Sequence, residues 1–298
     1  MAAWLAISSC YVTLPVGTSK KNKKHGMKTS GHLRKMRTEA SQPVQYHLPL
    51  DDELVPMNDY LGNTVSLNFS GDIHCIECAR KTAKSYNQGY CYPCFISLAA
   101  CDMCIMKPET CHFDKGTCRE PEWAQGHCMQ DHVVYLANSS GLKVGITRGS
   151  QVPTRWIDQG ATQALPIFRV KNRLLSGLLE VAIKGHVSDR TDWRKMLKGE
   201  AEALDLRAKR DELLDAAASQ VEDVRAAHPD DHIEFLGDAE PVSLNFPVNE
   251  YPEKVKSLNL DKTPGIEGQL MGIKGQYLIL DSGVLNIRKF AGHHVALG

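Results

Sequence analysis

Nine of the ten cysteines of this 298-residue chain lie between residues 75 and 128. Four of them form two Cys-x-x-Cys pairs, Cys75 with Cys78 and Cys91 with Cys94, and 12 residues separate the pairs. Each pair presents two thiolates to one ion, and two pairs complete the tetrahedral shell of Zn²⁺, with Zn–S distances of about 2.3 Å. The spacing predicts a closed, structural zinc site that leaves no coordination position for a substrate. Free structural cysteines are the alternative.

A second group of potential ligands follows directly. Cys101-x-x-Cys104 is a third pair, and further thiols and imidazoles lie downstream at Cys111, His112, Cys118, His127, Cys128 and His132. We predict a second structural zinc, held by Cys101 and Cys104 with two downstream residues, for which we favour Cys118 and Cys128. The chain shows no recognisable export signal, so we expect a cytoplasmic location, where thiols stay reduced and metal ligation is favoured over disulfides.

Composition excludes some classes of protein. Lys and Arg together number 35 and so do Asp and Glu, so the net charge exerts no overall attraction towards nucleic acid or membranes. No run approaches the roughly 20 apolar residues that span a bilayer, so we expect no membrane partner. Residues 1–28, with a lysine-rich stretch, are expected to be a disordered tail.

Four segments after the cysteines contain residue types suited to phosphate chemistry. They are His132-Val-Val-Tyr-Leu-Ala, Leu142-Lys-Val-Gly-Ile-Thr-Arg, Thr154-Arg-Trp and Leu179-Glu-Val-Ala-Ile-Lys. Over residues 132–198 they resemble the core of the GIY-YIG endonucleases, in which a hairpin carries two triplets, the first helix an arginine and a later helix a metal-binding glutamate. The resemblance implies catalytic roles for Tyr135, Lys143, Arg155 and Glu180.

These residue types fit the chemistry that the resemblance implies. The carboxylate of Glu180 would hold a divalent cation such as Mg²⁺ or Mn²⁺, and Arg155 would stabilise charge on the phosphate in the transition state. The phenol of Tyr135 would supply or activate the nucleophile. Lys143 replaces the second tyrosine of the family's pattern, and the first triplet lacks its glycine. Which group acts as general base is therefore open.

Basic and aromatic residues alternate around this core, and Lys and Arg outnumber Asp and Glu between residues 143 and 198. Such residues contact phosphates and stack on bases. We predict nucleic-acid contacts, with DNA or RNA, for Arg148, Trp156, Arg190, Trp193 and Arg194. An ordinary solvated surface is the alternative.

From about residue 29 onward the chain also resembles an uncharacterised bacterial family, the domain of unknown function 2797. The similar segments include Pro108-Glu-Thr-Cys-His, Lys143-Val-Gly-Ile-Thr-Arg and Arg155-Trp-Ile-Asp-Gln-Gly-Ala. That family implies no activity.

The expected fold class is α+β, with a zinc-ribbon-like module followed by a GIY-YIG-like mixed α/β core. The expected parts are an N-terminal β segment over 29–73, a two-zinc module over 74–131, the core over 132–198, a long helix within 199–231 and a C-terminal β segment over 232–298. Neither β segment has enough strands for a stable core, so we expect the two to pair.

Three functions are compatible with this sequence. The first is a divalent-metal-dependent endonuclease. The second is a non-catalytic protein that binds nucleic acid or the ribosome through a degenerate nuclease fold. The third is an interaction protein whose partner surface is the helix predicted over 199–227, although the sequence indicates no particular protein partner.

Overall fold

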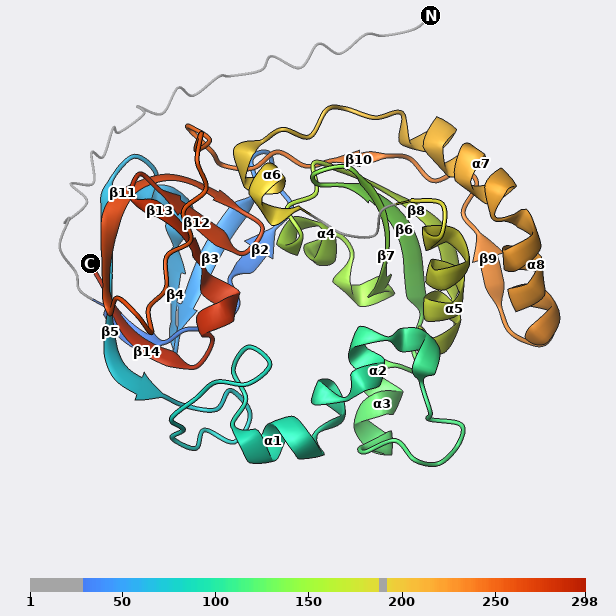
Figure 1. Cartoon of the computed structure of the whole chain (residues 1–298), viewed down its shortest axis with the longest axis horizontal. Helices are drawn as coiled ribbons and strands as arrows, with labels where there is room; N and C mark the ends of the chain where they lie inside the picture. Colours follow the sequence, from blue (N-terminus) through green and yellow to red (C-terminus); the bar gives the residue numbers. More distant parts are fainter. Residues whose placement is uncertain (1–28, 188–191) are drawn as a thin grey trace, which may run out of the picture.

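The computed structural model describes residues 29–187 and 192–298. It has the predicted α+β fold, in which three β-sheets combine with the helices (Figure 1). The tail expected over residues 1–28 and the predicted contact residue Arg190 lie outside the described residues. Within the described ranges, no helix is both long and apolar enough to cross a membrane.

The largest sheet joins strands from both ends of the chain. It has six antiparallel strands in the order β1-β14-β5-β11-β12-β13. The strands are β1 (Thr29–His32), β5 (Thr64–Ile73), β11 (Gly265–Lys274), β12 (Tyr277–Leu280), β13 (Gly283–Asn286) and β14 (His293–Leu297). The predicted pairing of the terminal β segments is therefore confirmed.

A three-stranded antiparallel sheet, β2-β3-β4, packs against the six-stranded sheet through a shared apolar core. Its strands are β2 (Arg37–Glu39), β3 (Gln45–Leu50) and β4 (Glu53–Pro56). Residues 32–37 have a strand-like composition, but the chain leaves strand geometry at residues 34–36. Leu33 and Met36 are fully buried, and the Met36 amide donates to Gln276 Oε1 at 2.8 Å. Burial of these two side chains takes precedence over local strand preference.

The third sheet contains the predicted hairpin and lies on the other side of the molecule (Figure 1). Its strands are β6 (His132–Asn138), β7 (Leu142–Arg148), β8 (Gln163–Val170), β9 (Ile233–Phe235) and β10 (Val242–Ser243). Every residue of β6 is buried. Val133 and Tyr135 face the core that the other sheets share, whereas Val134 faces a helical layer. The strand is continuously apolar because both of its faces are covered.

Three helices form that layer: α5 (Arg173–Lys184), α7 (Leu206–Ala216) and α8 (Ala218–Ala227). The single helix predicted over 199–227 is thus wrong in extent. Its N-terminus is set by Asp205, whose carboxylate accepts from the amides of Arg207 and Ala208. At Ala217 the backbone leaves helical geometry, with φ −98° and ψ 7°, and divides the helix in two.

The sheets form two β lobes: the six-stranded and three-stranded sheets make one, and the five-stranded sheet makes the other. The cysteine-rich segment lies below both lobes in Figure 1. Its helices are α1 (Tyr92–Ser97), α2 (Met103–Met106) and α3 (Pro121–His127), and two further short helices, α4 (Thr154–Asp158) and α6 (Trp193–Lys198), lie beside the sheets. Gly177 allows the segment to approach α5, because a Cβ at this position would lie 2.5 Å from the Glu109 amide nitrogen. The segment is therefore packed directly on the helix that carries Glu180.

Candidate functional site

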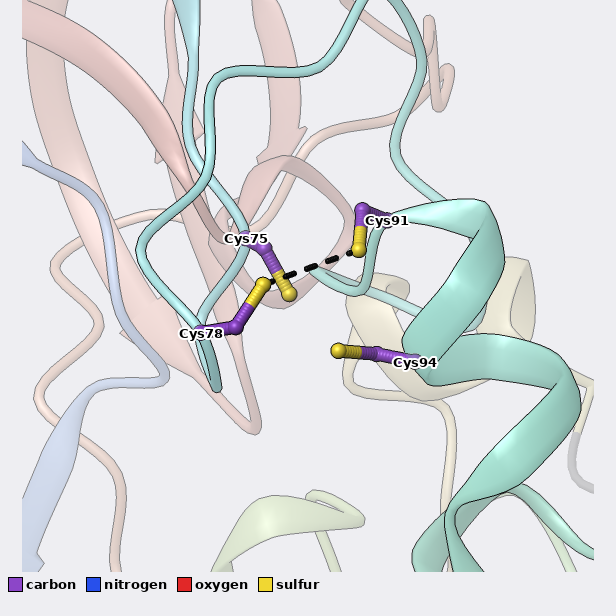
Figure 2. Close-up of side chains that lie close together, drawn as sticks. All are labelled: Cys75, Cys78, Cys91 and Cys94. Atoms are coloured by element: carbon purple, nitrogen blue, oxygen red, sulfur yellow. Dashed lines mark hydrogen bonds between the residues drawn. The ribbon is translucent and has the colours of Figure 1, made fainter.

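The first two Cys-x-x-Cys pairs form one cluster. Cys75 and Cys78 lie in the loop after β5, whereas Cys91 precedes α1 and Cys94 lies in its first turn. Their four sulfur atoms all lie within 4.8 Å of one another. The Cys78 and Cys91 sulfurs are 3.7 Å apart, and Figure 2 shows the thiols directed towards one another. This four-sulfur arrangement could hold one metal ion, as the spacing predicts.

The electrostatics of this cluster also favour a cation. Burial opposes ionisation of the Cys75 thiol, but backbone amides of Cys78, Cys91 and Glu77 outweigh it and lower the thiol's pKa to about 6. Burial and the three neighbouring thiols raise the pKa of Cys94. Four thiolates cannot share this space without a compensating positive charge. A bound divalent cation would supply that charge.

The second group of cysteines differs from the predicted one. Of the predicted ligands, Cys104, Cys118 and Cys128 line one cavity of about 10 Å³, where Cys111 lies in place of Cys101. Cys101 faces a different space, and its sulfur accepts from Asn87 Nδ2 at 3.5 Å. The Cys101–Cys104 pair does not form a single turn, because Cys101 ends a 3₁₀ helix and α2 begins only afterwards, at Met103.

Three of the four predicted catalytic residues line one open cavity of about 480 Å³. Lys143 comes from β7, Arg155 from α4 and Glu180 from α5. In chain order, these elements are the hairpin β6–β7, the helix α4 with the arginine, the strand β8 and the helix α5 with the glutamate. The sheet and the α5 layer thus bring together residues that are up to 37 positions apart in sequence.

Tyr135, the fourth predicted catalytic residue, does not line this cavity. Its side chain is fully buried, and its hydroxyl donates to Gln159 Oε1 at 3.1 Å. Burial raises the pKa of Tyr135 to about 12, although the neighbouring Arg155 guanidinium acts in the opposite direction. Its ring lies over Gly145, where a Cβ would come within 2.8 Å of the ring. Tyr135 therefore positions Gln159, which does line the cavity.

The cavity is strongly basic. Six of its lining residues are Lys or Arg and two are acidic. One of the acids, Asp158, is paired with Lys35 and accepts from Gln276 Nε2 at 2.9 Å. The polar residues of the cavity that the sequence did not single out include Lys35, Gln159, Arg173 and Arg288. Lys35 and Arg288 come from the terminal β segments, and no local motif marks them.

The cations in this cavity repel one another. Burial, and then Arg155, lower the pKa of Lys143 to about 8, against the opposing effect of Glu180. Burial and Arg155 also contribute to lowering the pKa of Arg173 and of Arg288. The positive charge of Arg155 therefore repels those of Lys143, Arg173 and Arg288. An anionic ligand placed among them would relieve this repulsion.

Of the predicted nucleic-acid contacts among the described residues, one lines the basic cavity and three do not. Arg148 lines the basic cavity. Trp156 is only 2% exposed and packs edge-on to Tyr135, with ring centroids 5.8 Å apart, so it cannot stack on a base. Trp193 stacks on Tyr277 with ring centroids 5.9 Å apart, and Arg194 lies over the Trp193 ring at 4.3 Å. Neither of them lines the cavity.

A second space of about 980 Å³ continues from the basic cavity. The two share Lys35, Ile105, Met106, Arg155 and Arg288. The second space runs past the cysteine-rich segment, where Tyr90 and Phe95 line it, to Arg34 and Arg37. Together the two spaces form a basic groove, with one wall made by the cysteine-rich segment.

One comparison with known proteins found a similarity. A family model described as "Protein of unknown function (DUF2797)" matches residues 62–295. Neither the curated proteins nor the solved structures contain a match to this chain. The matched range includes both groups of cysteines and all of the predicted catalytic residues.

Proposed function

Since the chain belongs to the family described as protein of unknown function DUF2797, whose description names no activity, we propose its function from the site. The chain is a zinc-binding, divalent-metal-dependent endonuclease that cleaves DNA or RNA. One observation carries this proposal: Lys143, Arg155 and Glu180, from three separate elements, line one basic cavity. The GIY-YIG resemblance implies that these three residues act together in catalysis.

The residues of the cavity have separate roles in phosphodiester cleavage. Glu180 offers a carboxylate, the oxygen ligand that Mg²⁺ and Mn²⁺ prefer. Arg155 and Arg173 are placed to bind the scissile phosphate and to stabilise its charge in the transition state. Tyr135 does not line the cavity, so Lys143 in its neutral form is the residue placed to accept a proton from an attacking water. A divalent cation held by Glu180 would lower the pKa of that water.

Zinc has a structural role in this proposal. The four-sulfur cluster of Cys75, Cys78, Cys91 and Cys94 holds one Zn²⁺ in a closed shell, which activates no water. The loop that it fixes contributes Ile76, Asn87, Gln88 and Tyr90 to the basic groove. Zinc would therefore shape the wall along which the substrate lies, whereas Glu180 would hold the divalent cation that assists cleavage.

The groove leading from the cavity suits a nucleic-acid strand. Cations such as Arg34 and Arg37 can contact phosphates, and the rings of Tyr90 and Phe95 offer faces for stacking. The groove is recessed between the two β lobes and the cysteine-rich segment. An unpaired strand or a flexible flap enters such a recess more easily than an intact duplex.

Arg155→Ala is the first test of this function. The purified chain is incubated with Mn²⁺ or Mg²⁺ and labelled single-stranded, double-stranded and flapped DNA and RNA. We expect Arg155→Ala to lose cleavage by roughly 100-fold or more, the usual effect of removing one group that stabilises transition-state charge. Arg169→Ala is the matched control, since Arg169 is exposed and pairs with Glu234. Equal loss in both variants, or no cleavage by the unmodified chain of any substrate, overturns the proposal.

A second function, binding without cleavage, is favoured by one observation. The Tyr135 phenol, to which the resemblance assigns activation of the nucleophile, is buried behind Gln159 and does not itself line the cavity. A degenerate site would keep its cations and bind nucleic acid through phosphates. Its affinity would fall linearly with salt on a log–log scale, with a slope set by the number of phosphates neutralised. Salt-dependent binding without cleavage would support this function.

A further inference from the structure

We propose that the chain holds a second metal ion, most simply Zn²⁺, in a site made by the thiolates of Cys104, Cys111, Cys118 and Cys128. This inference is independent of whether the basic cavity cleaves nucleic acid. It differs from the set that the sequence predicts, because Cys111 takes the place of Cys101.

The four thiols come from separate places and meet at one cavity. Cys104 lies in α2, Cys111 follows the short helix Pro108–Thr110, Cys118 lies in the loop before α3, and Cys128 follows α3. The cavity is about 10 Å³, close to the space that one water molecule or one ion occupies. Among the described residues no three of these sulfurs lie within 4.8 Å of one another, so binding one ion would draw the four thiolates inward to the tetrahedral shell of Zn²⁺.

The other potential ligands nearby already have partners. Asp102, Cys104 and His112 also lie within 4.8 Å of one another. However, the Asp102 carboxylate accepts from Arg119 Nε at 2.8 Å, and His112 Nδ1 bonds Thr117 Oγ1 at 2.8 Å. These contacts fix both side chains beside the cavity. The bond at Nδ1 leaves His112 Nε2 able to coordinate, so His112→Ala is a further test: the variant keeps two ions if sulfur alone coordinates, and loss of one ion would place His112 in the ligand set.

The segment also needs an ion to fold. Of residues 101–131 only three are buried, namely Pro108, Ala124 and Cys128. Its two α-helices have 4 and 7 residues, too short to be stable by themselves. An apolar core this small cannot offset the loss of chain entropy on folding. A metal ion bound by four thiolates can supply the missing stability.

This second site adjoins the basic cavity through Arg173. The Arg173 amide donates to the Cys128 carbonyl at 2.8 Å, and its Nη2 donates to the Ile105 carbonyl at 2.6 Å. A zinc ion with four thiolates carries a net charge of −2, and the neighbouring Arg173 guanidinium offsets part of it. Because Arg173 also lines the basic cavity, metal in the second site holds this cation in place there.

The metal content of the full chain tests the proposal. We expect two Zn²⁺ per unmodified chain and one per Cys111→Ser chain, measured by elemental mass spectrometry after dialysis. Cys101→Ser is the matched control and should keep two ions. One ion in the unmodified chain, two in Cys111→Ser, or one in Cys101→Ser would each overturn the proposed ligand set.

Cobalt distinguishes loss of a ligand from misfolding. The chain loaded with Co²⁺ should show thiolate-to-metal charge transfer and tetrahedral absorption from two ions. Cys111→His should keep both ions, since imidazole can replace a thiolate, and should change the absorption of one of them. A Cys111→His spectrum identical to that of the unmodified chain, at two ions per chain, contradicts the role of Cys111.

Discussion

The folded protein buries a lysine whose removal should stabilise it. Lys274, at the end of β11, is fully buried, and its amine has no hydrogen-bond partner among the described residues. Its positive charge makes cation–π contacts with the rings of Phe246 and Tyr251, whose centroids lie 5.4 and 5.2 Å from Nζ. Burial lowers the pKa of Lys274 from 10.5 to about 8.

The size of the effect follows from that shift. At about 1.36 kcal/mol per pKa unit, keeping the Lys274 amine charged at pH 7 costs the folded state about 3 kcal/mol. The two ring contacts return roughly 1–2 kcal/mol. Lys274→Met keeps a long, flexible side chain without the charge, so we expect it to raise the free energy of unfolding by about 1–3 kcal/mol at pH 7.

The stability gained by Lys274→Met should decrease as the pH rises. Because the folded-state pKa of Lys274 is below its unfolded value, the unfolded chain binds more protons between pH 8 and 10.5. The stability of the unmodified protein should therefore rise relative to that of Lys274→Met across this window, and the advantage of the variant should shrink.

Urea unfolding measures this at pH 7, 8, 9 and 10 with constant zinc. The exposed Lys289→Met is the control and should change stability by no more than about 0.5 kcal/mol. A Lys274→Met variant that is less stable at pH 7, or whose advantage is the same at all four pH values, would refute the reasoning.

Three further predictions concern the sites. Cys78→Ser should remove one zinc ion per chain and lower thermal stability, as metal analysis and calorimetry would show; unchanged zinc content would exclude the four-sulfur site. Gly145→Ala should cost about 1–3 kcal/mol of stability in urea unfolding, because its Cβ would lie 2.8 Å from the buried Tyr135 ring; a neutral effect would mean that the ring can move. Oligonucleotide affinity should weaken as pH rises through about 8, where Lys143 loses its charge, and fluorescence anisotropy of Lys143→Met should show no such step.

Parts of this structure could be predicted from the sequence because the signals are local. The Cys75–Cys94 cluster follows from spacing alone, since each pair lies within one turn. The hairpin around Tyr135 and Gly145 follows from two apolar runs and a turn. The helix carrying Glu180 follows from its apolar period and appears as α5.

Other features depend on contacts that no local pattern shows. Cys101 does not line the cavity of Cys104, Cys111, Cys118 and Cys128, because the backbone around Asp102 separates the thiols of the third pair. Trp156 was predicted to stack on bases, yet the sheets bury it, since its helix packs between two lobes. Arg288 is 108 residues from Glu180 in sequence, and only the pairing of the terminal β segments brings it to the same cavity.

The central claim is that Glu180 binds the divalent metal of a phosphodiesterase site. Its most direct test is the single-turnover cleavage rate of Glu180→Gln, with Mn²⁺ and the best substrate, beside Glu222→Gln, an exposed glutamate of α8. We expect a loss of at least about 100-fold for Glu180→Gln, unchanged zinc content in both variants, and full activity for Glu222→Gln. Cleavage by Glu180→Gln at the unmodified rate would contradict this claim.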